Sequence, residues 1–226
     1  MSLEPPEAHV LPPASGLLPA ARNVLWRHAA RARALVVLFP GMAYGADAPL
    51  LRFSRLAALE MGCDVLEVEY AFQAARAPYR AESEDSVVGE VCDTLGRASA
   101  AGYGRRMFVS KSLGTRLAPA VAKAAGLRVD DQVFLTPIPS SVPVIEGSGA
   151  LVVTGSADPL LAPVWRARLA ADAGLRLRII DRADHALEVP GDVRASLAAL
   201  HAVTLDVLGA LEAFAGSADG GGRHRR

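Results

Sequence analysis

A serine-rich pentapeptide follows a short apolar run and is built to place a reactive hydroxyl at a sharp turn. The run is Met107–Val109, and the pentapeptide Ser-Lys-Ser-Leu-Gly occupies residues 110–114. A serine with small residues two positions away on each side is typical of a strand-to-helix turn that raises the serine above a sheet, because the two backbones nearly touch there. Ser112 is therefore our candidate nucleophile. The alternative is that Ser110 or Ser112 only caps the following helix.

An acid and a base follow this serine along the chain, each just past a predicted strand. Residues 150–155 are mostly apolar or β-branched and predict a buried strand, and Asp158 lies in the turn after it. Residues 175–180 alternate as a strand does, and His185 lies in the loop that follows. Serine, histidine and aspartate can act as nucleophile, general base and orienting group of the base. The order Ser112, Asp158, His185 is one of the few chain orders in which such triads occur.

Together these motifs resemble those of the α/β-hydrolases, and especially the small, lidless serine hydrolases of the dienelactone hydrolase and carboxylesterase type. The segments that carry the resemblance are the strand and oxyanion-hole loop at 35–45, the nucleophile elbow at 110–114, the acid loop at 154–158 and the histidine loop at 184–187. Two departures are Ser110, where the elbow has glycine, and Phe39-Pro40 before Gly41, where many members have histidine. The departures remove no triad member but leave the subfamily, and hence the substrate, open.

The resemblance implies a serine hydrolase that cleaves a small ester, with thioesters and activated amides as near variants, and that needs no metal or organic cofactor. Its catalytic residues would be Ser112, Asp158 and His185, and the backbone N–H groups of Met42 and Leu113 would form the oxyanion hole. Hydroxynitrile lyases and cofactor-free oxygenases can use the same triad. An alternative of a different class is a non-catalytic protein of this fold that binds a small ligand or a partner, because a fold does not establish a function.

Other residues of the same types compete for these roles. Ser110 is a rival nucleophile, but it lies two positions earlier and still within the predicted strand. Asp184 and Asp181 are rival acids, although residues so close in sequence to His185 seldom point the right way.

Three further titratable residues are open to other interpretations. Lys111 adjoins the candidate nucleophile, and with a histidine available we interpret it as a residue that shapes the turn or its electric field. His28 falls in or at the end of a strand and His201 in a helix, where a structural histidine is the ordinary expectation.

The elements that must position these residues alternate between strands and helices. Strands are expected at 23–29, 34–39, 64–70, 107–109, 132–136, 150–155 and 175–180, and helices at 49–61, 82–101, 113–125, 162–173 and 193–214. Because each parallel crossover needs a covering helix, the alternation predicts an α/β fold with a doubly wound, mostly parallel sheet flanked by helices. We expect one domain over 22–215, an irregular Pro-rich lead-in over 1–21 and a flexible tail over 216–226.

The connection before the acid strand is short. Residues 137–149 are too few for the helical lid that larger relatives of this fold insert there, so we expect an open cleft suited to water-soluble substrates of modest size. Tyr44, Phe72 and Tyr79 are candidate substrate contacts, with simple packing as the alternative for each. Tyr44 is also a candidate donor to the oxyanion.

From charge and composition we expect no nucleic-acid or membrane partner. The 226 residues are 51% hydrophobic, which is enough to form one buried core. Their formal net charge is zero, so the sequence shows no basic surface that would bind nucleic acid or an anionic membrane. No stretch was expected to be long and apolar enough to span a bilayer, which predicts a cytoplasmic protein. Cys63 and Cys92 are too few for a disulfide scaffold or a metal site. The oligomeric state is left open.

Overall fold

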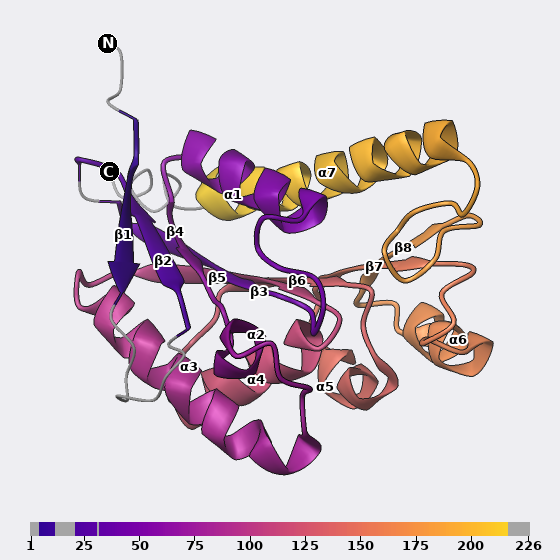
Figure 1. The fold of residues 1–226 in the computed structure, drawn as a ribbon. Coiled ribbons are helices and arrows are strands. Elements are labelled where there is room, and N and C mark those ends of the chain that lie inside the picture. Colours follow the sequence, from indigo (N-terminus) through magenta and orange to yellow (C-terminus); the bar gives the residue numbers. More distant parts are fainter. Residues whose placement is uncertain (1–4, 12–20, 31, 217–226) are drawn as a thin grey trace.

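The protein forms one eight-stranded sheet with helices on both faces (Figure 1). The computed structural model describes residues 5–11, 21–30 and 32–216. The strands are β1 Glu7–Leu11, β2 Asn23–Arg27, β3 Ala34–Phe39, β4 Asp64–Glu67, β5 Arg105–Lys111, β6 Asp131–Leu135, β7 Leu151–Gly155 and β8 Arg176–Ile180, in the order β1-β2-β4-β3-β5-β6-β7-β8. The six strands from β4 to β8 along the sheet pair in parallel, and β1 and β2 are antiparallel. The predicted fold class is confirmed.

The helices form two layers. The longer ones are α1 Pro49–Glu60, α3 Glu84–Ser99, α4 Gly114–Ala124, α6 Pro163–Ala171 and α7 Val193–Gly216, and the four-residue helices are α2 Ala71–Ala74 and α5 Val142–Ile145. Helices α1 and α7 cover one face of the sheet, and α3, α4, α5 and α6 cover the other (Figure 1). Because both faces are covered, the central strands are apolar throughout rather than alternating.

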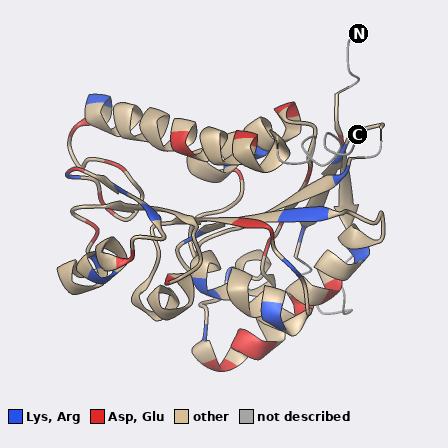
Figure 2. Ribbon diagram, turned by 180° about the vertical axis from the view of Figure 1, so that it is seen from behind, with Lys and Arg blue, Asp and Glu red and all other residues tan. Residues whose placement is uncertain are grey.

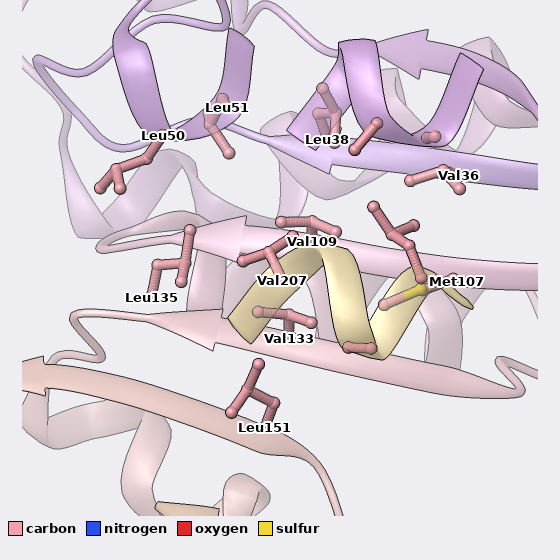
Figure 3. Close-up of a cluster of buried hydrophobic side chains, with 14 of the residues drawn as sticks. Val36, Leu38, Leu50, Leu51, Met107, Val109, Val133, Leu135, Leu151 and Val207 are labelled. Carbon is pink, nitrogen blue, oxygen red and sulfur yellow. The ribbon is translucent and has the colours of Figure 1, made fainter. Parts of the chain in front are cut away.

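The core divides into clusters on the two sides of the sheet. Alternate residues of β3 show why: Val36 and Leu38 pack toward α1 and α7, whereas Leu35 and Val37 pack toward α3 and α4, and all four are fully buried. Figure 3 shows the first cluster, in which Val207 of α7 lies over side chains of the parallel strands. Burial of each such side chain contributes about 1.5–3 kcal/mol. This packing fixes the strand ends that carry the site.

The expectation of an irregular lead-in over 1–21 is wrong for Glu7–Leu11, which forms β1 and pairs antiparallel with β2. Four of its five residues are exposed, so the strand is held by backbone pairing at the sheet edge and has no apolar alternation to reveal it. The rest of the lead-in lies outside the described residues, except for 5–6 and 21. Helix α7 extends to Gly216, and the remainder of the predicted tail also lies outside.

The expectation that no segment is long and apolar enough to cross a membrane is also wrong. By length and composition alone α7 is such a helix. A helix that covers a core passes the same test, and α7 buries Val203, Val207, Leu211 and Phe214. Figure 2 shows Lys, Arg, Asp and Glu spread over most elements, whereas α7 carries few of them.

Strand β7 ends against the loop after β8 without room for a side chain. A Cβ placed on Gly155 would lie only 2.0 Å from the carbonyl oxygen of Ala183, which belongs to that loop. The loop can therefore pack on the end of β7 only if residue 155 is glycine.

We predict that Gly155→Ala lowers the free energy of unfolding by about 2–4 kcal/mol, because the added methyl must displace backbone. Thermal or urea unfolding would measure it. Gly96→Ala makes the same chemical change on α3, where the Cβ meets nothing within 4 Å. It should stabilise by about 0.5–1 kcal/mol. Equal effects of the two changes would contradict the prediction.

Candidate active site

Ser112 lies at a sharp turn between β5 and α4. Its φ is 52°, in the left-handed region that few residues other than glycine adopt. A Cβ on Gly114 would lie 2.4 Å from the carbonyl oxygen of Phe39 at the end of β3, so only glycine fits there. Ser110 remains inside β5, where it is buried and its hydroxyl donates to the Val133 carbonyl, 3.1 Å away. The turn therefore presents Ser112 and not Ser110.

The structure brings the three predicted residues into one hydrogen-bonded array. The distance from Ser112 Oγ to His185 Nε2 is 2.8 Å, and that from His185 Nδ1 to Asp158 Oδ2 is also 2.8 Å. The three residues follow β5, β7 and β8, and they meet because the carboxyl ends of parallel strands share one edge of the sheet. Asp158 is 3% exposed, and its other oxygen accepts the Leu160 N–H at 2.8 Å. The acid is therefore held in place from both sides.

Asp158 is kept ionised by these contacts. Burial disfavours its charged form, but the hydrogen bonds from His185 and the Leu160 N–H, with the charge of Lys111 nearby, outweigh burial and hold the pKa of this carboxyl below its ordinary value. With a pKa lowered by folding, the group adds stability at neutral pH, and this stability is lost as the pH falls through the lowered value. An ionised Asp158 favours the His185 tautomer with the proton on Nδ1.

The rival acids are placed for other tasks. One oxygen of Asp184 accepts the N–H groups of Ala186, at 2.8 Å, and Glu188, at 3.1 Å, so this side chain shapes the histidine loop. Asp181 is exposed. Neither makes a hydrogen bond to the His185 ring within the described residues.

The backbone N–H groups of Met42, in the loop after β3, and of Leu113, before α4, donate to no acceptor among the described residues. Gly41 brings this loop close to the serine, since a Cβ on Gly41 would be 3.1 Å from Ser112 Cβ. The N-terminus of α4 also favours negative charge. That these two N–H groups bind an oxyanion stays a prediction.

Sequence reasoning missed Gln73, which fixes the direction of one of these donors. Its side-chain amide donates to the carbonyl oxygens of Gly41, at 2.8 Å, and Met42, at 3.3 Å. In a planar trans peptide the C=O and the N–H point in opposite directions, so holding the Gly41 carbonyl turns the Met42 N–H the other way. The amide oxygen of Gln73 accepts the Tyr70 N–H at 3.1 Å, which anchors the side chain to α2. A glutamine in a predicted loop gave no signal of this contact.

The three predicted aromatic contacts differ in their surroundings. The hydroxyl of Tyr44 accepts the Leu50 N–H at 2.9 Å, at the start of α1. Phe72 lies between Tyr70 and Tyr79, at 5.3 and 5.4 Å between ring centres, and packs with the core cluster that includes Leu113. Tyr79 also donates to Glu84 at 2.8 Å. The contacts of Phe72 are therefore those of a packing residue.

Two cavities are lined by residues that neighbour the array in sequence. One of about 290 Å³ lies beside the residues that follow His185, and it is lined mainly by Tyr44, Leu50, Leu187, Val193, Leu197 and Leu200. The other, of about 500 Å³, lies beside the residue that follows Ser112, and it is lined mainly by Tyr79, Glu82, Glu84, Leu113, Arg116 and Ile138. The first wall is largely apolar, and the second mixes apolar and charged groups.

The remaining candidates lie apart from the array. His28 is structural, with Nδ1 at 3.2 Å from Asp64 and Nε2 at 3.0 Å from the Leu59 carbonyl oxygen. His201 is exposed on α7. Lys111 is buried behind the turn. Within the described residues, His, Cys, Asp and Glu form no group of three or more that could hold a metal ion.

Comparison with known proteins identifies the fold. No protein-family model matches the sequence, and no curated protein does. Among solved structures, a dienelactone hydrolase from Anabaena variabilis is 16% identical with a TM-score of 0.64, covering 89% of this chain and 97% of its own. A serine hydrolase without a lid from Xanthomonas campestris is 13% identical with a TM-score of 0.63, and the match covers 94% of this chain and 95% of that protein. A protein of unknown function from Agrobacterium tumefaciens has a TM-score of 0.72 at 10% identity, and the match covers 93% of this chain and 97% of that protein.

The protein therefore has the α/β-hydrolase fold. It is the form without a lid, since residues 137–149 contain only α5 and one 3₁₀ turn. The resemblance inferred from the sequence motifs is confirmed as a likeness of fold. At sequence identities of 10–16%, the likeness to these structures shows the fold alone.

We predict that Gln73→Leu slows covalent labelling of Ser112 by a fluorophosphonate at least tenfold, because the Met42 N–H loses its fixed direction and a mispointed donor stabilises developing charge less well. Intact-protein mass spectrometry over time would give the rate. The matched control is Gln132→Leu, at the far end of β6, which should label as the native chain does. Labelling of Gln73→Leu at the native rate would contradict this function of Gln73.

Proposed function

We propose that the protein is a serine hydrolase that cleaves a small ester or a related acyl substrate through an acyl-enzyme. The observation that carries the proposal is the hydrogen-bonded array at the turn: Ser112 Oγ lies 2.8 Å from His185, whose other nitrogen lies 2.8 Å from the buried Asp158. A hydroxyl, an imidazole and a carboxylate in this order activate the hydroxyl as a nucleophile. The positive φ of Ser112 adds support, because backbone strain of this kind is common at functional sites.

The proposed mechanism follows from the geometry. His185 Nε2 accepts the Ser112 proton as the hydroxyl oxygen attacks the substrate carbonyl, and Asp158 stabilises the imidazolium that forms. The N–H groups of Met42 and Leu113 stabilise the oxyanion. His185 then gives the proton to the leaving alcohol, and the acyl group stays on Ser112. Water, deprotonated by His185, attacks the acyl-enzyme and releases the acid.

Both cavities support a substrate of modest size. An ester has two parts, and the two cavities are lined by the residues that follow His185 and by the residue that follows Ser112. The volume of the apolar cavity, about 290 Å³, is at the lower limit for small-molecule sites, which favours a short acyl or single-ring group. A neighbour of the same fold, Est1E from Butyrivibrio proteoclasticus, has been solved with ferulic acid bound, at 11% identity and a TM-score of 0.62. We therefore include aromatic esters in the substrate class.

The first test is labelling by a fluorophosphonate serine-hydrolase probe. We expect the native chain to be labelled and Ser112→Ala and His185→Ala to lose labelling, because the first removes the nucleophile and the second its base. Ser110→Ala is the control, since Ser110 is held in β5 and should not affect labelling. A folded native chain that resists labelling would overturn the proposal in favour of a non-catalytic ligand-binding protein.

The acid can be tested separately by hydrolysis of p-nitrophenyl esters of increasing chain length. Asp158→Asn should lower the hydrolysis rate on the order of 10⁴-fold, because an asparagine favours the wrong tautomer of the histidine. Asp184→Asn is the matched control and should change the rate less than tenfold, since its contacts are to backbone N–H groups of the loop. A larger loss with Asp184→Asn than with Asp158→Asn would reverse the assignment.

A further inference from the structure

Lys111 is a buried cation that the proposed mechanism leaves without a task. It directly precedes the serine, and only 1% of its surface is exposed. Its ammonium group donates to Thr136 Oγ1 and to the backbone carbonyl oxygen of His185, the latter at 2.7 Å. The ring centre of Tyr44 lies 4.9 Å from Nζ. One side chain thus connects the ends of β5 and β6, the histidine loop and the oxyanion loop.

The partner of Lys111 on β6 is strained. Thr136, just past the end of the strand, has a φ of 44°, which is unusual for a β-branched residue. It is fully buried, and its N–H donates to the Val153 carbonyl of β7 at 2.6 Å. Such strain persists only where surrounding contacts determine the conformation. Thr136 is therefore a well-held point in the sheet, to which Lys111 can tie the neighbouring histidine loop.

The backbone of the histidine loop has one described hydrogen bond to β5, the bond from Lys111. Its other backbone bonds are local, from Asp184 N–H to the Glu188 carbonyl, at 2.8 Å, and from Leu187 N–H to the Asp184 carbonyl, at 3.1 Å, and the adjoining Ala183 carbonyl accepts the Ala157 N–H of the turn after β7, at 2.9 Å. These shape the loop but do not join it to the strand that carries Ser112. The bond from Lys111 to the His185 carbonyl does, because Lys111 is the last residue of β5.

We propose that Lys111 is a positioning residue that ties the backbone of the histidine loop to β5 and β6 and so sets the distance between His185 Nε2 and Ser112 Oγ. The positioning of a reactive pair rests on the proposed function, whereas the tie itself does not. No proton or electron moves in this role. Small displacements of such a pair slow a reaction strongly, because attack needs aligned atoms.

The charge state of Lys111 is consistent with this role. Burial lowers the pKa of its ammonium group to about 8, against the smaller opposing effects of Asp158 and Asp184. Within the described residues no carboxylate forms an ion pair with it. A folded-state pKa below the unfolded one means that the charged amine opposes folding at neutral pH. A buried lysine that destabilises the fold in this way is more typical of a functional site than of a hydrophobic core.

The test compares native protein with Lys111→Met, which keeps the length of the side chain and removes the donors. Thr136→Val removes the hydroxyl that accepts from Lys111, and Thr136→Ser keeps it. Two readouts are taken on each folded variant: hydrogen exchange of the peptide that spans 183–189, measured by mass spectrometry, and the rate of fluorophosphonate labelling.

We expect Lys111→Met to speed exchange of the Asp184 and Leu187 amides at least tenfold, and to slow labelling at least tenfold, while α3 exchanges as in the native chain. Thr136→Val should change both readouts in the same direction and Thr136→Ser neither. Unchanged exchange in 183–189 would overturn the tie, whether or not the native chain is labelled. Faster exchange with native labelling would overturn the positioning of Ser112 and His185. If the native chain resists labelling, the proposed function fails, and exchange alone decides the tie.

If Lys111→Met does not fold, the variants Thr136→Val and Thr136→Ser test the tie instead. Equal exchange in Thr136→Val and Thr136→Ser would then overturn the tie, and faster exchange in Thr136→Val alone would support it.

Discussion

The contact between the turn at Ser112 and the end of β3 is the constraint on which the site depends. Gly114 lies so close to the Phe39 carbonyl that any side chain would clash, and a Cβ on Gly41 would make a tight contact of 3.1 Å with Ser112 Cβ. This approach sets the steep turn, and the steep turn places the serine hydroxyl above the sheet. It also brings the loop after β3 beside the serine, so that the same packing positions Ser112 and the loop that carries the Met42 N–H.

The other loops are joined to this centre by polar contacts from residues that do not react. Gln73 holds the oxyanion loop through two carbonyl oxygens, and Lys111 reaches the carbonyl of His185. Both contact backbone carbonyl oxygens and not the Met42 N–H or the His185 ring. Gly155 completes the arrangement by letting the histidine loop lie against β7. Polar contacts from Gln73 and Lys111 thus surround an array whose two hydrogen bonds are each 2.8 Å long.

The residues at strand ends could be predicted because an apolar strand and the polar residue after it are both local signals, and parallel strands bring such residues to one edge. The supporting contacts could not, since Gln73 lies 32 positions from Gly41 and Lys111 lies 74 from His185. β1 escaped prediction because its side chains are exposed and only its backbone is paired. The membrane-like composition of α7 escaped because alanines and occasional charges interrupt its apolar run without lowering its average hydropathy much.

The missing lid has a kinetic consequence. Under the proposed function, an acyl group on Ser112 would sit at an edge of the sheet that residues 137–149 do not cover with a lid. Enzymes that pass acyl groups to alcohols or amines must keep water from the intermediate, usually by closing the site. With only residues 137–149 between β6 and β7, this chain has no element there to close over the serine. The partition of the intermediate would therefore favour the free acid, and net reaction would run toward hydrolysis rather than transfer.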